Sequence, residues 1–339
     1  MDPDAEVTFE FVPVIRQYKS GRVERLLPIN PVPPSVDAAT GVASKDVTVD
    51  PATGLWARLY LPVSARPDND RRRLPIVLYF HGGGLVVGSA ADAPEHAFVN
   101  RLAARAGALA VSVEYRLAPE HPVPACYDDA WAALRWVVTS AADPWVRDHG
   151  DVARVFVLGF SAGANLAHNL TLRAGSEPET EPDLLPRGAR VQGMALVHPF
   201  FLSPPAPAPG DKGSKAAEEG EVAKYAWVRG KLAEMWAFAC GEGRTAAGPD
   251  DPRVNPLADG APSLRRLGCA RVLVCLADDA LVAEGKAYYD GLLASGWAAA
   301  DAELLDSAPA DHEFHLREPD SAKAVLLMDR LVALITGNQ

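Results

Sequence analysis

A serine flanked by two glycines lies near the middle of the sequence, at Ser161 between Gly159 and Gly163. A serine hydroxyl is a weak nucleophile unless the fold presents it to a base and to backbone N–H donors that receive a developing oxyanion. A strand that turns directly into a helix presents a serine in this way. The two glycines replace side chains that would collide in so tight a turn. The pattern therefore predicts Ser161 as a nucleophile after a buried strand at residues 155–159.

Three consecutive glycines follow the apolar run 74–80 and His81. Successive glycines can turn their N–H groups toward one point, because no Cβ blocks the dihedral angles that this requires. A phosphate-binding loop would need a following Lys-Ser/Thr or a Gly-x-Gly-x-x-Gly pattern, and neither is present. We therefore expect an oxyanion hole in which Gly83 and Gly84 donate together with the N–H of Ala162.

A serine nucleophile needs a base, and the base needs a carboxylate that holds its tautomer. Where a strand–turn–helix carries the serine, the acid comes later in the chain, just after a late strand, and the histidine lies in a loop after the next one. Asp279 follows the apolar run 271–276, and His312 lies in the loop 311–315. This order predicts Asp279 and His312 as the partners of Ser161.

Neighbouring residues compete for these two roles. His315 is the rival base, whereas His168 is expected to pack within or on a helix and His198, at a strand end, to tether a loop. The rival carboxylates are Asp278, Asp306 and Asp311.

Composition and charge narrow the class of protein. The 339 residues carry a formal net charge of -11, which disfavours nucleic acid and anionic membranes as partners. The acidic N-terminus lacks the pattern of a signal peptide, and no apolar run has the length of a membrane span, so we expect a cytoplasmic protein, with the nucleus as a second location. The cysteines show no metal-binding spacing and are expected to be buried free thiols, and we expect no metal or cofactor.

The hydrophobic pattern alternates strands with helices, which predicts one α/β domain over residues 1–339 with a mostly parallel sheet and helices on both faces. Residues 7–28 are expected to be extended or partly helical. We expect a small cap, formed from about residues 1–35 and 202–240, over the carboxyl ends of the strands. The expected strands are 45–50, 56–61, 74–80, 108–114, 155–159, 192–197, 271–276 and 302–305. The expected helices are 92–106, 127–139, 222–240, 284–295 and 321–335.

Four motifs together resemble those of plant carboxylesterases of the hormone-sensitive-lipase-like group, which have the α/β-hydrolase fold. The motifs are His81–Gly84, Tyr115–Glu120, Gly159–Gly163 and Asp311–His315. The resemblance spans roughly residues 10–335. It implies Ser161 as nucleophile, His312 as base and Asp279 as its orienter, with Gly285 six residues after the acid as in the family. It also implies that the N-terminal segment and the helix near 222–240 cover the acyl pocket.

The chain departs from the family pattern at Phe160, where Asp is usual. This change removes a polar support near the turn, although the residue takes no part in the proton transfers. The similar gibberellin receptors lack the catalytic histidine, so the presence of His312 favours an enzyme. The related 2-hydroxyisoflavanone dehydratases use the same site to eliminate water. Hydrolysis of a small carboxylic ester is therefore the first hypothesis, with a non-catalytic hormone receptor and a dehydratase as alternatives.

An ester hydrolase needs a cleft lined by apolar side chains. The residues that flank the catalytic loops are the expected wall, although each is equally compatible with a place in the core. They are Leu85, Val86, Phe160, Phe200, Phe201 and Leu281. The expected partner is a small-molecule ester, apolar or a plant metabolite, and the expected assembly is a monomer or a homodimer.

Overall fold

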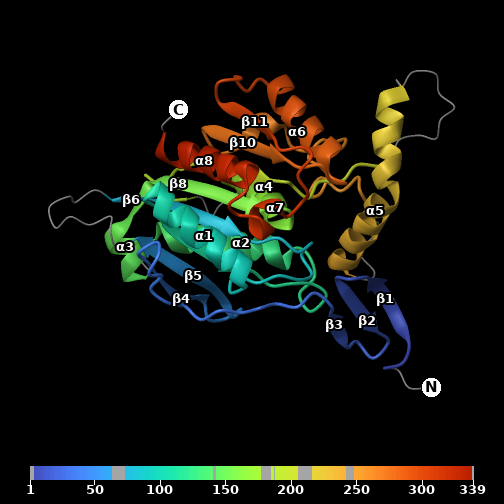
Figure 1. The fold of residues 1–339 in the computed structure, drawn as a ribbon, viewed down its shortest axis with the longest axis horizontal. Coiled ribbons are helices and arrows are strands. Elements are labelled where there is room, and N and C mark those ends of the chain that lie inside the picture. Colours follow the sequence, from blue (N-terminus) through green and yellow to red (C-terminus); the bar gives the residue numbers. More distant parts are fainter. Residues whose placement is uncertain are drawn as a thin grey trace.

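A central sheet of eight strands organises the molecule, in the order β11-β10-β9-β8-β6-β7-β5-β4 (Figure 1). The computed structural model describes residues 4–62, 73–139, 143–176, 185–186, 188–204, 216–241 and 248–337, and of 216–224 the backbone alone. The strands are β4 (Val42–Asp50), β5 (Leu55–Pro62), β6 (Leu74–Phe80), β7 (Leu109–Glu114), β8 (Gly150–Phe160), β9 (Val191–Val197), β10 (Arg271–Leu276) and β11 (Ala302–Asp306). Strand β5 pairs antiparallel with β4 and β7, and the other pairs are parallel.

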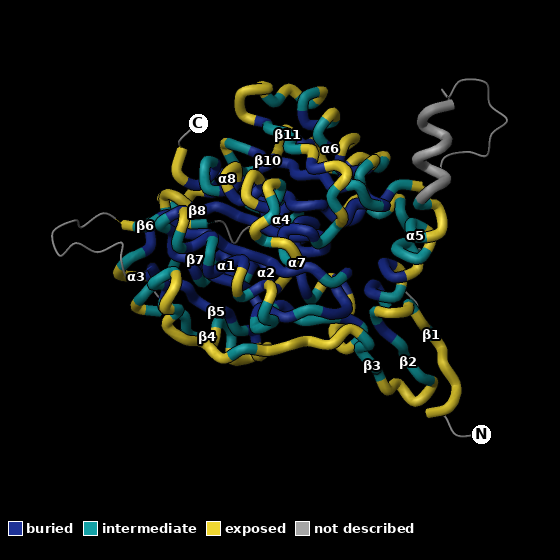
Figure 2. Tube along the Cα trace, viewed as in Figure 1, coloured by how far each residue is buried: buried dark blue, intermediate teal, exposed yellow. Residues whose placement is uncertain are grey.

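The middle strands are apolar along their length because both faces of the sheet are covered. Leu78 of β6 pairs with Val111 of β7 and Val157 of β8, and all three side chains are fully buried. Figure 2 shows the same strands as the buried centre of the fold. The mostly parallel α/β sheet expected from the sequence is therefore confirmed.

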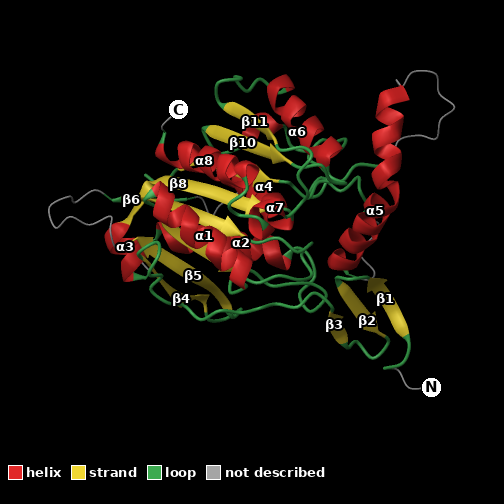
Figure 3. Cartoon of the chain, in the orientation of Figure 1, coloured by secondary structure: helices red, strands yellow, loops and turns green. Residues whose placement is uncertain are grey.

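Helices cover the two faces of this sheet (Figure 3). Helices α1 and α8 pack on one face, where Phe98 and Leu327 join the same buried cluster. Helices α2, α4 and α6 pack on the other face, through residues such as Leu134 and Leu166. The helices are α1 (Ala93–Ala106), α2 (Ala125–Val138), α3 (Pro144–His149), α4 (Ala162–Ala174), α5 (Ala216–Cys240), α6 (Val282–Ala294), α7 (Phe314–Arg317) and α8 (Ala322–Thr336), with a 3-10 turn at Leu264–Arg266.

Short-range sequence signals fix several helix ends. Asp92 caps α1 by accepting a hydrogen bond from Ala93, and Gly107 ends that helix in the left-handed conformation, with φ of 56°. Ser321 caps α8 by accepting from the N–H of Ala324. Helices α3 and α7 were not expected from the sequence, because each spans only one or two turns and carries too few apolar positions to show a period.

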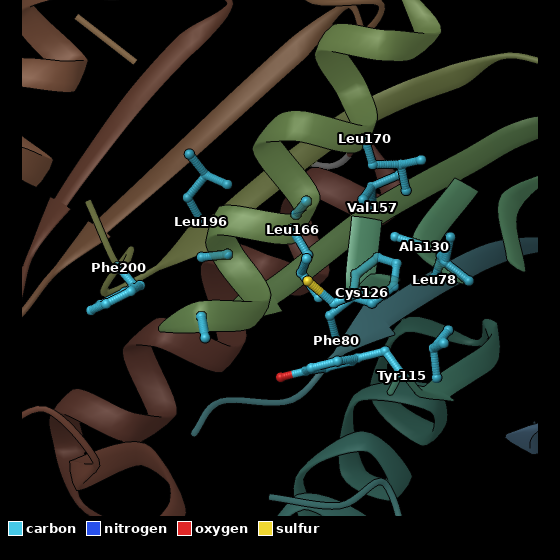
Figure 4. Packing of buried hydrophobic residues seen from close by; sticks show 14 of the residues in the cluster. Leu78, Phe80, Tyr115, Cys126, Ala130, Val157, Leu166, Leu170, Leu196 and Phe200 are labelled. Atoms are coloured by element: carbon cyan, nitrogen blue, oxygen red, sulfur yellow. The ribbon is translucent and has the colours of Figure 1, made fainter. Parts of the chain in front are cut away.

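The core beneath α4 packs side chains from β6, β8 and β9 against those of α2 and α4 (Figure 4). Leu166 of α4 and Cys126 of α2 meet Phe80 and Leu196 there, and all four are buried. All four cysteines are free thiols, as expected, and three of them are buried.

The N-terminal residues form a separate three-stranded antiparallel sheet of β1 (Val7–Phe11), β2 (Ile15–Tyr18) and β3 (Val23–Arg25). The expectation of extended structure was right, and its partly helical alternative was wrong. Alternation of apolar and polar residues in β1 places Phe9 toward α5, where its ring stacks on Phe238 with centroids 4.0 Å apart. Arg25 ties this sheet to the body by donating to the carbonyl of Val86 at 2.7 Å.

Candidate active site

Ser161 lies at a sharp turn between the end of β8 and the start of α4. Its backbone has φ of 53° and ψ of -115°, a strained conformation for a residue with a side chain. A Cβ at Gly159 would lie 2.6 Å from the N of Ala164, and one at Gly163 would lie 2.6 Å from the O of His81. The turn therefore closes only because both flanking residues are glycine.

The next strand holds this turn in place. The N–H of Ser161 donates to the carbonyl of Val197, at the end of β9, at 2.8 Å. The N–H of Phe200 donates back to the carbonyl of Ser161 at 3.0 Å. These bonds fix the serine backbone against the segment that follows β9.

The glycine loop after β6 adopts a conformation that needs glycine. Gly83 and Gly84 have φ of 110° and 62°, and a Cβ at Gly83 would lie 2.7 Å from the carbonyl carbon of Val87. The hydroxyl of Tyr115 donates to the carbonyl of His81 at 2.9 Å, and the two rings stack with centroids 4.3 Å apart. The loop is thus supported from the side of the Tyr115–Glu120 motif.

A buried carboxyl group supports the same loop from the other side. Glu95 of α1 is 6% exposed and accepts a hydrogen bond from the hydroxyl of Tyr79 at 2.6 Å and a long one from the N–H of Gly82 at 3.4 Å. Burial raises the pKa of Glu95 to about 7, although both hydrogen bonds oppose the shift. Sequence reasoning missed this residue, because a lone Glu at a helix start is typical of the first turn of any helix.

His312 and Asp279 form a hydrogen-bonded pair. Their Nδ1 and Oδ2 atoms are 2.5 Å apart, and the other carboxylate oxygen of Asp279 accepts from the N–H of Leu281 at 2.8 Å. A carboxylate only accepts, so Nδ1 of His312 carries a proton, and Nε2 is the nitrogen that could accept one in a neutral ring. Burial by itself raises the pKa of Asp279, but the hydrogen bond and charge of His312 outweigh it and lower that pKa.

The rival carboxylates have other partners. Asp278 accepts from the hydroxyl of Tyr225 on α5 at 2.9 Å. Asp306 and Asp311 each accept from a backbone N–H two residues ahead in their own turns.

The rival histidines are packed inside the fold. His168 lies 3.0 Å from the hydroxyl of Tyr288, as a packed helix residue. His315 is 2% exposed and packs edge-on against the ring of Phe160, with centroids 4.7 Å apart. His198 bonds to the main chain of His312, which is the loop tether that the sequence suggested.

Ser161, His312 and Asp279 line one cavity of about 270 Å³, together with Gly83 and Gly84. Ala162 follows Ser161 as the first residue of α4 and is fully buried. Of the expected apolar wall, the structure places these residues in the cavity lining: Phe160, Phe200 and Leu281.

The structure places the other expected wall residues elsewhere. The chain turns tightly after Gly84, which sends Leu85 and Val86 into the core and Val87 into the cavity wall. Phe201 packs against Tyr288 and lines a different cavity of about 770 Å³.

Sequence reasoning named no lining residue from the cap segments, although both contribute. The N-terminal segment supplies Phe11, Val14 and Leu27, and α5 supplies Val228, Leu232 and Met235. A Cβ at Gly84 would lie 2.7 Å from the sulfur of Met235, so this side chain covers the glycine loop. The sequence identified the segments, but nothing local in it shows which of their faces meets the cavity.

Among the residues that the structure describes, no group of three or more His, Cys, Asp or Glu side chains could hold a metal ion. Across those same parts of the chain, none of the helices is both long and apolar enough to cross a membrane.

Residues 77–316 match the model of a protein family described as having the alpha/beta hydrolase fold. The chain belongs to this α/β-hydrolase family. Probable carboxylesterase 2 of Arabidopsis thaliana is 37% identical over 333 residues, which cover 97% of this chain and 96% of that protein. Tuliposide A-converting enzyme 1 of Tulipa gesneriana, a chloroplast protein, is 38% identical over 98% of this chain and 79% of its own.

Solved structures agree with this α/β-hydrolase assignment. Esterase LipW from Mycobacterium marinum superposes with a TM-score of 0.65 at 27% identity, over 88% of this chain and 83% of its own. The thermostable carboxylesterase EstE1, from a metagenomic library, gives a TM-score of 0.65 at 26% identity over 90% of each chain. The resemblance to plant carboxylesterases inferred from the motifs is therefore confirmed, and the protein is a carboxylesterase-type α/β hydrolase.

Proposed function

We propose that the protein hydrolyses small carboxylic esters through an acyl-enzyme on Ser161. The observation that carries this proposal is the hydrogen bond between His312 and Asp279 at the wall of the cavity that also holds Ser161 and the glycine loop. A nucleophile, an oriented base and backbone donors around one apolar cavity are the parts that acyl transfer requires.

In the first half of the reaction, Oγ of Ser161 attacks the ester carbonyl carbon and Nε2 of His312 takes its proton. The negative charge of Asp279 stabilises the imidazolium that results. The oxyanion of the tetrahedral intermediate accepts hydrogen bonds from the N–H groups of Gly83, Gly84 and Ala162. When the intermediate collapses, the bond to the alcohol oxygen breaks, His312 returns the proton to that oxygen, and the acyl group stays on the serine.

In the second half, a water molecule replaces the alcohol. His312 takes a proton from the water as its oxygen attacks the acyl carbon, and the same N–H groups hold the second oxyanion. Collapse releases the carboxylic acid and returns the proton to Oγ of Ser161. One oxyanion donor typically contributes about 3 to 4 kcal/mol to lowering the barrier, which is why the conformation of the glycine loop matters.

The size and lining of the cavity favour a compact, apolar ester. A volume of about 270 Å³ is just below the range typical of sites for drug-sized ligands. Its walls combine aromatic and aliphatic side chains from the body, the N-terminal sheet and α5. An acyl chain of a few carbons fits this space better than a long one.

The test is release of p-nitrophenol from p-nitrophenyl acetate and butyrate by the purified protein, beside Ser161→Ala and His312→Ala. We expect turnover by the parent and a fall of about 10⁴-fold or more in each variant, since the triad acts as a unit. A folded parent that is as inert as both variants would refute the proposal. Stoichiometric ligand binding without turnover would then indicate a receptor, and a product lighter by one water with no acid released would indicate a dehydratase.

A further inference from the structure

His198 lies where the ends of three parallel strands meet. It follows β9 directly, and its N–H donates to the carbonyl of Cys275 in β10 at 2.9 Å. The residue before it, Val197, accepts the N–H of Ser161 at the end of β8. The backbone at His198 is therefore fixed to the strand that leads to Asp279 and sits beside the bond that holds the nucleophile.

The ring of His198 makes one hydrogen bond, to the main chain of the proposed base. Nδ1 lies 2.7 Å from the carbonyl oxygen of His312, and since a carbonyl only accepts, Nδ1 carries the proton. The other ring nitrogen is buried without a partner in the described part of the chain. Burial lowers the pKa of His198 to about 3, so the ring is neutral wherever an esterase works.

Aromatic neighbours leave this ring little room to turn. Phe160 lies edge-on to it with centroids 5.9 Å apart, Phe314 lies at 5.4 Å, and His315 lies edge-on at 5.3 Å. The side chain is 1% exposed. The donor thus points in a fixed direction, from a backbone that is itself fixed.

The backbone conformation of His198 adds a second constraint. Its φ of 46° is in the left-handed region, which histidine and asparagine enter more readily than most residues. Nothing in the reaction chemistry requires a histidine here, because its Nε2 is enclosed. The geometry does require a short side chain with a proton donor that tolerates this φ.

We propose that His198 is a positioning residue for the hydrolysis proposed above. The Nδ1–H of His198 holds the main chain of His312 at a fixed place relative to the strand ends that carry Ser161 and Asp279. This contact sets the direction of the His312 imidazole. The inference rests on the proposed function, since it assigns no chemistry to His198 itself.

A matched pair of substitutions separates the donor from the volume. His198→Asn keeps an N–H donor near the place of Nδ1 and tolerates positive φ, whereas His198→Phe keeps an aromatic ring without a donor. With p-nitrophenyl butyrate, we expect His198→Phe to lower kcat by about 10- to 100-fold, the range that a displacement of up to 1 Å produces, with KM within threefold. His198→Asn should keep at least a third of the parental kcat.

A second readout does not depend on turnover. The proton between His312 and Asp279 should give a far-downfield NMR resonance, because the hydrogen bond is short and its acceptor is charged. We expect this resonance in the parent and in His198→Asn, and its loss or a shift toward ordinary values in folded His198→Phe. Thermal melting reports folding in each case.

The outcomes distinguish this inference from the proposed function. An active parent with an unchanged kcat and resonance in His198→Phe overturns the inference alone, as does an equal fall in both variants. A parent that is inert with every ester refutes the proposed function, and the resonance then still decides whether His198 orients His312.

Discussion

The most specific structural prediction concerns Gly163, where the turn after Ser161 meets the end of β6. A Cβ there would lie 2.6 Å from the carbonyl oxygen of His81 and closer still to that of Phe80, whereas ordinary contact begins at 3.4 Å. The neighbouring atoms are backbone, and the nearest is the carbonyl oxygen of Phe80, so Gly163→Ala must push α4 and the end of β6 apart by about 1.4 Å before the distance to that oxygen reaches 3.4 Å. Such overpacking typically destabilises by about 1 to 3 kcal/mol, and misplacement of about 1 Å at a reacting centre lowers the rate by about 100-fold.

The assay compares kcat for p-nitrophenyl butyrate and the melting temperature of Gly163→Ala with those of Gly230→Ala. Gly230 lies on an exposed face of α5, and a Cβ there would meet nothing within 4 Å. Gly230→Ala should keep the parental kcat and have a slightly higher melting temperature than the parent, because alanine in a helix interior is more stable than glycine by about 0.5 to 1 kcal/mol. Full activity in folded Gly163→Ala would refute the reasoning that the two glycine-dependent segments hold each other in place.

Three further outcomes follow from the site. Asp279→Asn should lower kcat for p-nitrophenyl butyrate by about 10⁴-fold with folding intact, because His312 loses its charged partner; a tenfold effect would contradict this. Burial raises the pKa of Glu95 from 4.5 to about 7. Between these two pH values the folded protein keeps a proton on Glu95 that the unfolded chain has lost, so the free energy of unfolding falls as pH rises. The melting temperature of Glu95→Gln should therefore be higher than that of the parent at about pH 8 and equal to it at about pH 4.5. Equal melting temperatures at both pH values would refute this. Met235→Ala uncovers Gly84, so the ratio of kcat/KM for p-nitrophenyl octanoate to kcat/KM for p-nitrophenyl acetate should rise about tenfold. An unchanged ratio would show that Met235 does not limit the length of the acyl chain.

The parts of the site that depend on local geometry could be predicted from the sequence. The spacing of Gly159, Ser161 and Gly163 specifies one turn, and the order of Asp279 and His312 along the chain follows from the order of the parallel strands. The structure brings these residues and the glycine loop to one cavity. Each of these signals lies within a few residues of the side chain that it concerns.

The parts that depend on packing between distant segments could not be predicted. Leu85 and Val86 flank the glycine loop in sequence, yet the turn sends them into the core. Met235 covers Gly84 from a helix about 150 residues away, and its apolar side chain carries no signal that separates a cavity wall from a core. Glu95 was missed as a support for the same reason, since its partners are the hydroxyl of Tyr79 and the N–H of Gly82. For His198 the sequence suggested a loop tether, but not that the tethered loop is the one that carries His312.

Covalent capture of the nucleophile tests the central claim most directly. The protein is treated with an alkyl p-nitrophenyl phosphonate, whose phosphorus takes the place of the ester carbonyl, and its intact mass and peptides are then measured. The account predicts one phosphonyl group per chain on Ser161, with labelling that slows by orders of magnitude in His312→Ala. Ester turnover by a chain that is labelled elsewhere, or that stays unlabelled, would contradict it.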